Sequence, residues 1–237
     1  MKDYVNLSAV LKRPVLLPEP FLWHLFECLS IVGLLLERGE IEHNPFKDWT
    51  LIVHRDFKIS NIFLGPPDKQ RFCHYPTPKL GDFGRAIYVP PNAKYNDVDF
   101  FGTAENYPIE TNWLITEERG EVPRPTSSKT NVWGVGNIIG SMMWKAEGVA
   151  NLKYWVKEGV HEASFVELEV KHYSKELREL VLLCMRYDQD DRPSFAPVLN
   201  HIRSLRNSGL DGHLRLAGPE SQSWEQYRLG PEPRETV

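Results

Sequence analysis

Apolar side chains recur every three or four residues in four stretches of the chain, a spacing that places them on one face of an α-helix. The first predicted helix covers residues 21–38 and is followed by Gly39, a residue type that often ends helices. The second covers 130–145 and is apolar on nearly every side, which predicts a central, buried helix. Two further helices are predicted at about 174–186 and 194–205, each beginning with a serine at the N-cap position.

Shorter apolar runs at 51–53 and 62–64 flank a polar centre at 54–61, and they predict β-strands on either side of a loop. A turn signal follows at 65–68, and we expect residues 65–78 to form a surface insertion. The residues before about 20 are expected to be irregular, and several prolines predict that 85–129 is mostly loop. The polar, Gly- and Pro-rich composition of 207–237 predicts a flexible tail.

The 237 residues carry a formal net charge of −4 and are 41% hydrophobic, which suits a folded protein of one large domain or two small ones. No long basic block is present, so nucleic acid is not an implied partner. Three widely spaced cysteines without a Cys-x-x-Cys pair disfavour a zinc ribbon and favour a reducing compartment. The most apolar segment, 21–36, is judged too short and too polar to span a bilayer. We therefore expect a cytoplasmic or nuclear protein with no membrane partner.

Two polar segments are candidates for chemistry. Residues 54–61 read HRDFKISN and residues 82–84 read DFG. In this order, each beside a short apolar run, they resemble the catalytic loop and the metal-binding loop of the eukaryotic-type Ser/Thr protein kinases. The alternative, that Asp56 and Asp82 are solvated loop carboxylates, is disfavoured because the two motifs occur together.

The resemblance extends over about residues 4–206. It implies an α+β, mainly helical fold: the C-terminal lobe of a protein kinase, with small β-hairpins at the catalytic cleft. The implied organisation is a kinase-like domain over 1–206 and a flexible tail over 207–237.

The resemblance also implies roles for individual residues. Asp56 would be the catalytic base for a hydroxyl of a protein substrate, and Lys58 would contact the transferred phosphoryl group of ATP. Asn61 and Asp82 would supply the hard oxygen ligands that Mg²⁺ prefers. Phe63 would lie beneath the adenine ring. Lys58, two residues after the aspartate, favours Ser/Thr kinases over tyrosine kinases.

Further residues around these motifs match structural or regulatory positions of the family. His54 and Phe83 would stack in its regulatory hydrophobic column, and Gly84 would permit a sharp turn where a Cβ would clash. Arg55 marks the kinases in which this arginine meets a phosphate of the activation loop. Because 85–101 contains no Ser or Thr, one of the aspartates within 97–99 is a candidate substitute for that phosphate.

Downstream, residues 102–110 read GTAENYPIE and resemble the substrate-docking segment, which includes Thr103. The family pattern pairs Glu110 of this segment with Arg192 inside the lobe. Asn131 stands where the family has Asp, which accepts hydrogen bonds from the backbone of the catalytic loop. A neutral amide makes a weaker bond than a carboxylate, so the sequence predicts a looser loop that Asn131→Asp should stiffen.

No Gly-rich loop and no V-A-I-K strand precede the catalytic loop in this sequence. Gly134, Gly136 and Gly140 lie on the predicted central helix, where small residues permit close packing. We therefore expect a truncated kinase domain without its N-terminal lobe, which binds ATP and Mg²⁺ weakly by itself. Two functions stay open: a Ser/Thr kinase, or a catalytically inactive pseudokinase lobe that binds protein partners, a regulatory protein among them, through 102–129.

Overall fold

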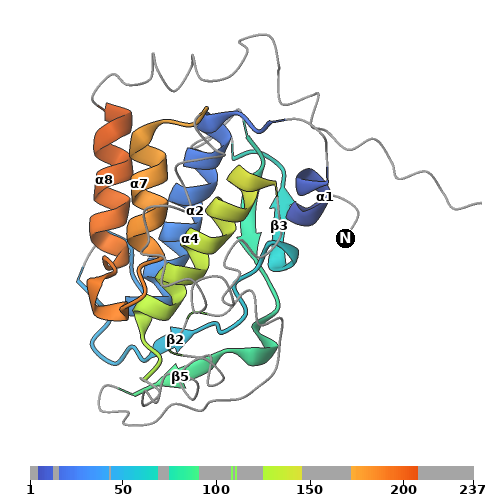
Figure 1. The fold of residues 1–237 in the computed structure, drawn as a ribbon. Helices are drawn as coiled ribbons and strands as arrows, with labels where there is room; N and C mark the ends of the chain where they lie inside the picture. The colour runs from blue at the N-terminus through green and yellow to red at the C-terminus, as the bar shows by residue number, and fades with distance from the viewer. Residues whose placement is uncertain are drawn as a thin grey trace, which may run out of the picture.

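The computed structural model describes residues 5–12, 16–42, 44–68, 75–90, 108, 110, 125–145 and 172–207. Four helices lie side by side: α2 (Glu19–Arg38), α4 (Ser128–Trp144), α7 (Lys175–Cys184) and α8 (Phe195–Asn207) (Figure 1). These are the four helices that the sequence predicts, each within a few residues of its expected bounds. The protein therefore has a mixed fold of helices and strands. Asn207, expected to begin the flexible tail, instead ends α8, and residues 208–237 lie outside the described residues.

The strands form two small sheets rather than one. β3 (Ile62–Gly65) lies between β1 (Val5–Asn6) and β4 (Thr77–Leu80), and both pairings are antiparallel. β2 (Leu51–Val53) pairs antiparallel with β5 (Ile87–Val89). The two predicted strands, β2 and β3, are therefore present but do not pair with each other. Residues 54–61 run from one sheet to the other, and 81–86 run back, so both polar motifs lie in the two crossings between the sheets.

Helix α2 is the buried axis of the helical layer. It begins with prolines at its first turn and ends at Gly39, whose φ of 74° is left-handed and is tolerated because glycine has no Cβ. By length and composition α2 could also cross a membrane, so the sequence-based judgement that it is too short and too polar was wrong. The most apolar stretch of α2 is 78% buried inside the fold, which is typical of a core helix.

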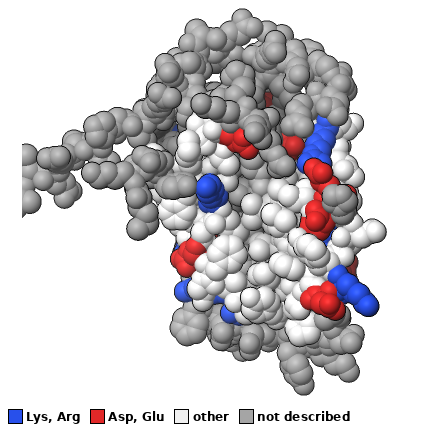
Figure 2. Space-filling view, turned by 180° about the vertical axis from the view of Figure 1, so that it is seen from behind, with Lys and Arg blue, Asp and Glu red and all other residues white. Residues whose placement is uncertain are grey.

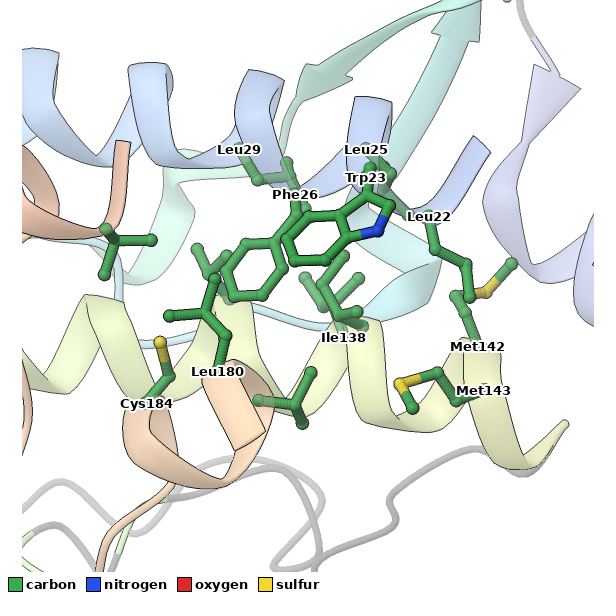
Figure 3. Close-up of a cluster of buried hydrophobic side chains, with 14 of the residues drawn as sticks. Leu22, Trp23, Leu25, Phe26, Leu29, Ile138, Met142, Met143, Leu180 and Cys184 are labelled. Carbon is green, nitrogen blue, oxygen red and sulfur yellow. The ribbon is translucent and has the colours of Figure 1, made fainter. Parts of the chain in front are cut away.

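Helix α4 packs between α2 and α7, and its side chains are buried from Thr130 to Met143. Ser127 and Thr130 cap its first turn reciprocally. Figure 3 shows apolar side chains from α2, α4 and α7 converging on one cluster. A Cβ at Gly134 would lie 2.4 Å from Phe57 Cβ, so this glycine lets the segment 54–61 approach α4 closely. Gly140 leaves ordinary room for a Cβ, so the close-packing expectation fails at that position.

Two local expectations were wrong. The region before residue 20, expected to be irregular, contains β1 and α1 (Leu7–Leu11). The stretch 85–129, expected to be mostly loop, includes the short strand β5 in its described part. The expected insertion at 65–78 is shorter, because β3 extends to Gly65 and β4 begins at Thr77. Its end is also packed against the core, since His24 Nε2 donates to Pro76 O at 2.9 Å. Strands of two to four residues are too short for a clear alternation of apolar and polar positions.

The reverse face of the molecule has a balanced charge distribution. Figure 2 shows a broad uncharged area in the middle of that face, with both acidic and basic side chains near its edges. This arrangement agrees with the small formal net charge of the whole sequence.

Candidate functional site

The two polar motifs are brought together by the β3–β4 ladder. Ile62 pairs with Leu80, and one step further along the ladder Gly81 N donates to Asn61 O at 2.9 Å. Asp82 is the next residue, so the ladder places it beside the end of the HRDFKISN segment. Two segments that are twenty residues apart in the sequence thus meet at one end of the hairpin.

Asp56, Lys58 and Asn61 form one hydrogen-bonded group. Lys58 Nζ lies 2.9 Å from Asp56 Oδ2. Asn61 Nδ2 donates to the same carboxylate oxygen and to the backbone carbonyl of Asp56, both at 2.9 Å. The Asp56 carboxylate is 6% exposed, and a buried carboxylate is stable only when it is paired and hydrogen-bonded in this way. Because both bonds use Nδ2, the Oδ1 of Asn61 is the atom of that amide left to coordinate a cation.

His54 is fully buried and connects the two motifs. Its Nε2 lies 3.1 Å from Gly81 O, and its Nδ1 lies 3.3 Å from Asp56 N. A carbonyl accepts and an amide donates, so the ring must donate at Nε2 and accept at Nδ1, which is the neutral imidazole. Burial lowers the pKa of His54, opposed by the Gly81 carbonyl and the carboxylates of Asp56 and Asp82, in agreement with a neutral ring. His54 thus acts as a structural link.

The ring of His54 also contacts the DFG phenylalanine. The two ring centroids are 4.8 Å apart with an interplanar angle of 69°, an edge-to-face arrangement of the kind that aromatic rings favour. The rings of His54 and Phe83, which the resemblance implied would stack, are therefore in contact, but edge to face. Phe83 is nevertheless 47% exposed and Phe63 is 37% exposed, so this side of the site presents two aromatic surfaces to solvent.

Backbone strain is concentrated in the two motifs. Arg55 and Asp82 have φ values of 61° and 59°, a left-handed conformation that is uncommon for residues with a Cβ. Arg55 Nε donates to Arg85 O at 2.7 Å, which ties one strained segment to the residue after the DFG sequence. The prediction that the backbone turns sharply at Gly84 was wrong, because the turn lies at another residue. The left-handed residue is Asp82, and a Cβ at Gly84 would meet Asp82 Oδ1 at 3.3 Å, which is tight contact rather than a severe clash.

Asn131 of α4 holds the start of the catalytic loop through both ends of its amide. Its Oδ1 accepts from His54 N at 3.0 Å, and its Nδ2 donates to Ile52 O at 2.8 Å. The backbone N–H of His54 fixes the oxygen on one side, so the nitrogen must face Ile52. An aspartate could accept from His54 but could not donate to Ile52. These two bonds argue against the expected loosening of the loop, because the amide makes one bond more than a carboxylate could make here.

Asn131→Asp is consequently expected to destabilise the protein rather than stiffen it. The variant would place a buried carboxylate oxygen against the Ile52 carbonyl, at a cost of about 1–3 kcal/mol in the free energy of unfolding. Chemical denaturation at pH 7 measures this cost, and Asn200→Asp on the exposed side of α8 is the matched control. The difference in the free energy of unfolding between the variant and the unmodified protein should become smaller as the pH falls toward about 4, because a protonated carboxyl group can donate to Ile52. Equal or greater stability of Asn131→Asp at pH 7 would contradict this account.

The ion pair predicted from the docking segment is present and buried. Arg192 Nη1 lies 2.6 Å from Glu110 Oε1, and Nη2 lies 2.9 Å from Oε2, which is a bidentate arrangement. Thr130 Oγ1 donates to the same carboxylate at 3.1 Å. Glu110 and Arg192 are 4% and 1% exposed, and this pair joins the segment before α4 to the turn before α8. Thr103, the aspartates within 97–99 and most of the 102–129 segment lie outside the described residues.

The donors of the site suit a magnesium ion shared with phosphate groups. Within the part of the chain that the structure describes, no three His, Cys, Asp or Glu side chains gather into a metal cage. Mg²⁺ is commonly held by one or two carboxylates together with substrate phosphates, and does not need such a cage. Asn61 and Asp82 are hard oxygen donors in the two segments that the Gly81 N–Asn61 O hydrogen bond joins, and residues of this type fit that kind of site.

Two contributions to the site had no signal in the sequence pattern. Asn6, from the short strand β1, donates through Nδ2 to Ser60 O inside the catalytic loop. Gly81 supplies both its N–H and its carbonyl to the two motifs. A Cβ at Gly81 would lie 2.8 Å from the Phe63 ring, a constraint that only the structure shows. Nothing local marks Asn6, which is 54 residues from its partner.

Comparisons with known proteins agree with the motifs. The family model described as the protein kinase domain matches residues 47–202. The serine/threonine-protein kinase Nek8 of Danio rerio is 29% identical over 193 residues, which cover 79% of this chain and 24% of Nek8. The G2-specific protein kinase nimA of Emericella nidulans is 29% identical over 159 residues, or 65% of this chain and 20% of nimA. The ephrin type-A receptor 4-A of Xenopus laevis is 25% identical over 224 residues, which cover 85% of this chain and 20% of the receptor. The chain spans about a quarter or less of the length of these relatives.

Proposed function

This chain belongs to the protein kinase domain family, and we propose that it transfers the γ-phosphoryl group of ATP to a serine or threonine hydroxyl of a protein. The observation that best supports this proposal is the setting of Asp56, whose Oδ2 is held by Lys58 and Asn61 at 2.9 Å each. Attack of a hydroxyl on a phosphoryl group requires an oriented hydroxyl and nearby positive charge, because negative charge accumulates on the transferred group.

The proposed roles follow from this geometry. Asp56 accepts a hydrogen bond from the substrate hydroxyl through its second oxygen, orients it, and takes its proton as transfer proceeds. Lys58 places its ammonium charge beside the transferred group. Asn61 Oδ1 and the Asp82 carboxylate would hold Mg²⁺, which when bound neutralises phosphate charge. Phe63, on the exposed face of β3, would provide an apolar surface for the adenine ring.

The serine/threonine preference is proposed from two observations. Lys58 stands two residues after the aspartate, and several relatives are named serine/threonine-protein kinases. The proposed partners are ATP, a protein substrate and a regulatory protein. We place this activity in the cytoplasm or nucleus, in agreement with Cys28 and Cys184, which are buried and form no disulfide among the described residues, while Cys73 lies outside them.

A second candidate function is a kinase-like binding module without catalysis. It is favoured by the exposed rings of Phe63 and Phe83, which offer an apolar surface to a protein partner. In this proposal the chain corresponds to the C-terminal lobe of a kinase and binds ATP weakly by itself.

A thermal-shift titration separates the two candidates. Near ten times the dissociation constant, ATP with Mg²⁺ is expected to raise the melting temperature of the 237-residue chain by about 3–6 °C, because ligand binding stabilises the folded state. ATP with EDTA should give a smaller shift. Asp82→Asn should remove most of the magnesium-dependent part, since it removes the charged ligand, while the exposed control Asp48→Asn should keep it. A folded chain that shows no response to ATP and Mg²⁺ would favour the binding module.

A further inference from the structure

One side chain of the N-terminal strand, that of Asn6, donates a hydrogen bond to the catalytic loop. Asn6 lies at the junction of β1 and α1, where its Oδ1 accepts from Ser8 N at 2.8 Å and caps the helix. Its Nδ2 donates to Ser60 O, which belongs to the catalytic loop. The backbone of β1 is also fixed there, because Asn6 is the partner of Phe63 in the β1–β3 ladder. Asn6 therefore uses both ends of its amide, and the two ends bind different parts of the molecule.

The bond to Ser60 acts on the peptide group that precedes Asn61. Ser60 O and Asn61 N belong to the same planar peptide unit. The N–H of that unit donates to Lys58 O at 3.0 Å, which closes the 3₁₀ turn Ile59–Asn61. Asn6 holds the carbonyl end of the unit while Lys58 O holds the amide end. With both ends held, the peptide plane cannot rotate freely, and the direction of the Asn61 side chain is fixed with it.

We propose that Asn6 is a positioning residue for the cation site: it fixes the Ser60–Asn61 peptide and thereby aims the Asn61 amide at Asp56 and at the bound ion. The part of this inference that concerns the ion rests on the proposed function, whereas the part that concerns the peptide does not. The Asn6–Ser60 hydrogen bond also links the conformation of the N-terminal segment to the geometry of the catalytic loop. Any displacement of β1 would move Asn6 Nδ2, the atom that donates to Ser60 O.

The competing account is that Asn6 serves α1 alone. Asparagine, aspartate and serine are about equally good at the N-cap, so a cap by itself would not require an amide. The two accounts are separated by Asn6→Asp, which keeps the acceptor for Ser8 N but cannot donate to Ser60 O. Asn6→Ser provides a second, uncharged variant that keeps the cap and is too short to reach Ser60.

Hydrogen exchange of individual backbone amides tests the positioning role directly. In both variants the amides of Asn61 and Ile62, which close the 3₁₀ turn, should exchange about three- to tenfold faster than in the unmodified protein. Amides in the middle of α4 should be unchanged, which distinguishes local opening from a general loss of stability. Asn200→Asp, the same chemical change at an exposed position of α8, should leave the turn amides as they are. Unchanged exchange at Asn61 and Ile62 in both variants would overturn the proposal and leave Asn6 as a helix cap.

A magnesium titration then tests the link to the ion. At fixed ATP, the Mg²⁺ concentration that gives half of the thermal shift should rise about three- to tenfold in Asn6→Asp and Asn6→Ser, with Asn200→Asp unchanged. A faster turn exchange with an unchanged magnesium midpoint would overturn the assignment to the cation site. If the unmodified chain shows no response to ATP and Mg²⁺, the proposed function fails, and the exchange result still decides whether Asn6 fixes the peptide.

Discussion

Replacing Arg192 by methionine is expected to lower the free energy of unfolding by about 3–5 kcal/mol, because it leaves the buried Glu110 carboxylate without its cation. The arginine makes more than the ion pair. Its Nε donates to Arg186 O at 2.7 Å, and its Nη groups also donate to Lys129 O at 3.2 Å and Tyr187 O at 3.1 Å. Its side chain is buried, so water cannot replace these bonds without opening the turn before α8. Urea denaturation at pH 7 measures the loss.

Two further variants test whether the loss comes from the buried ion pair. Arg178→Met removes a partly exposed arginine of α7, whose Nε lies 3.4 Å from Ser174 O, and should cost less than about 1 kcal/mol. The double variant Arg192→Met with Glu110→Met should cost less than the sum of the two single changes, because the stranded charge is removed together with its partner. A loss in Arg192→Met no larger than that in Arg178→Met would show that the ion pair contributes little.

Asp56→Asn is expected to reduce the rate of phosphoryl transfer to a serine-containing protein by about 10²- to 10⁴-fold while leaving the fold intact. An amide has nearly the same shape as a carboxylate, and its oxygen can still accept from Lys58 Nζ and Asn61 Nδ2. It cannot take a proton from the attacking hydroxyl. Single-turnover transfer of labelled phosphate measures the rate, and urea denaturation checks that stability is preserved.

The matched control for this variant is Asp48→Asn, which makes the same change at an exposed position after α2 and should transfer at the rate of the unmodified protein. Equal rates for Asp56→Asn and the unmodified chain would remove Asp56 from the proposed mechanism. A chain that responds to ATP and Mg²⁺ in the thermal-shift titration but transfers no phosphate above background would be assigned to the inactive binding module.

The secondary structure of the helical layer could be predicted from the sequence because its signals are local. Helix α2 begins at its prolines and ends at Gly39, and Ser174 caps α7 by accepting from Leu177 N at 3.2 Å. Apolar spacing alone identified the buried faces of these helices. The family could be predicted for a similar reason, because the motifs at 54–61 and 82–84 are continuous stretches of sequence.

The sequence by itself therefore determined the four long helices, the family and the residues on which the proposed chemistry depends. Only the tertiary structure decided which strands pair, that Asn131 donates to Ile52 as well as accepting from His54, and that Asn6 reaches Ser60. The physical reason is the range of the interactions. Helix periodicity and capping act within a few residues, whereas a hydrogen bond between residues 54 to 79 positions apart exists only after the chain has folded and leaves no mark in the local pattern of either partner.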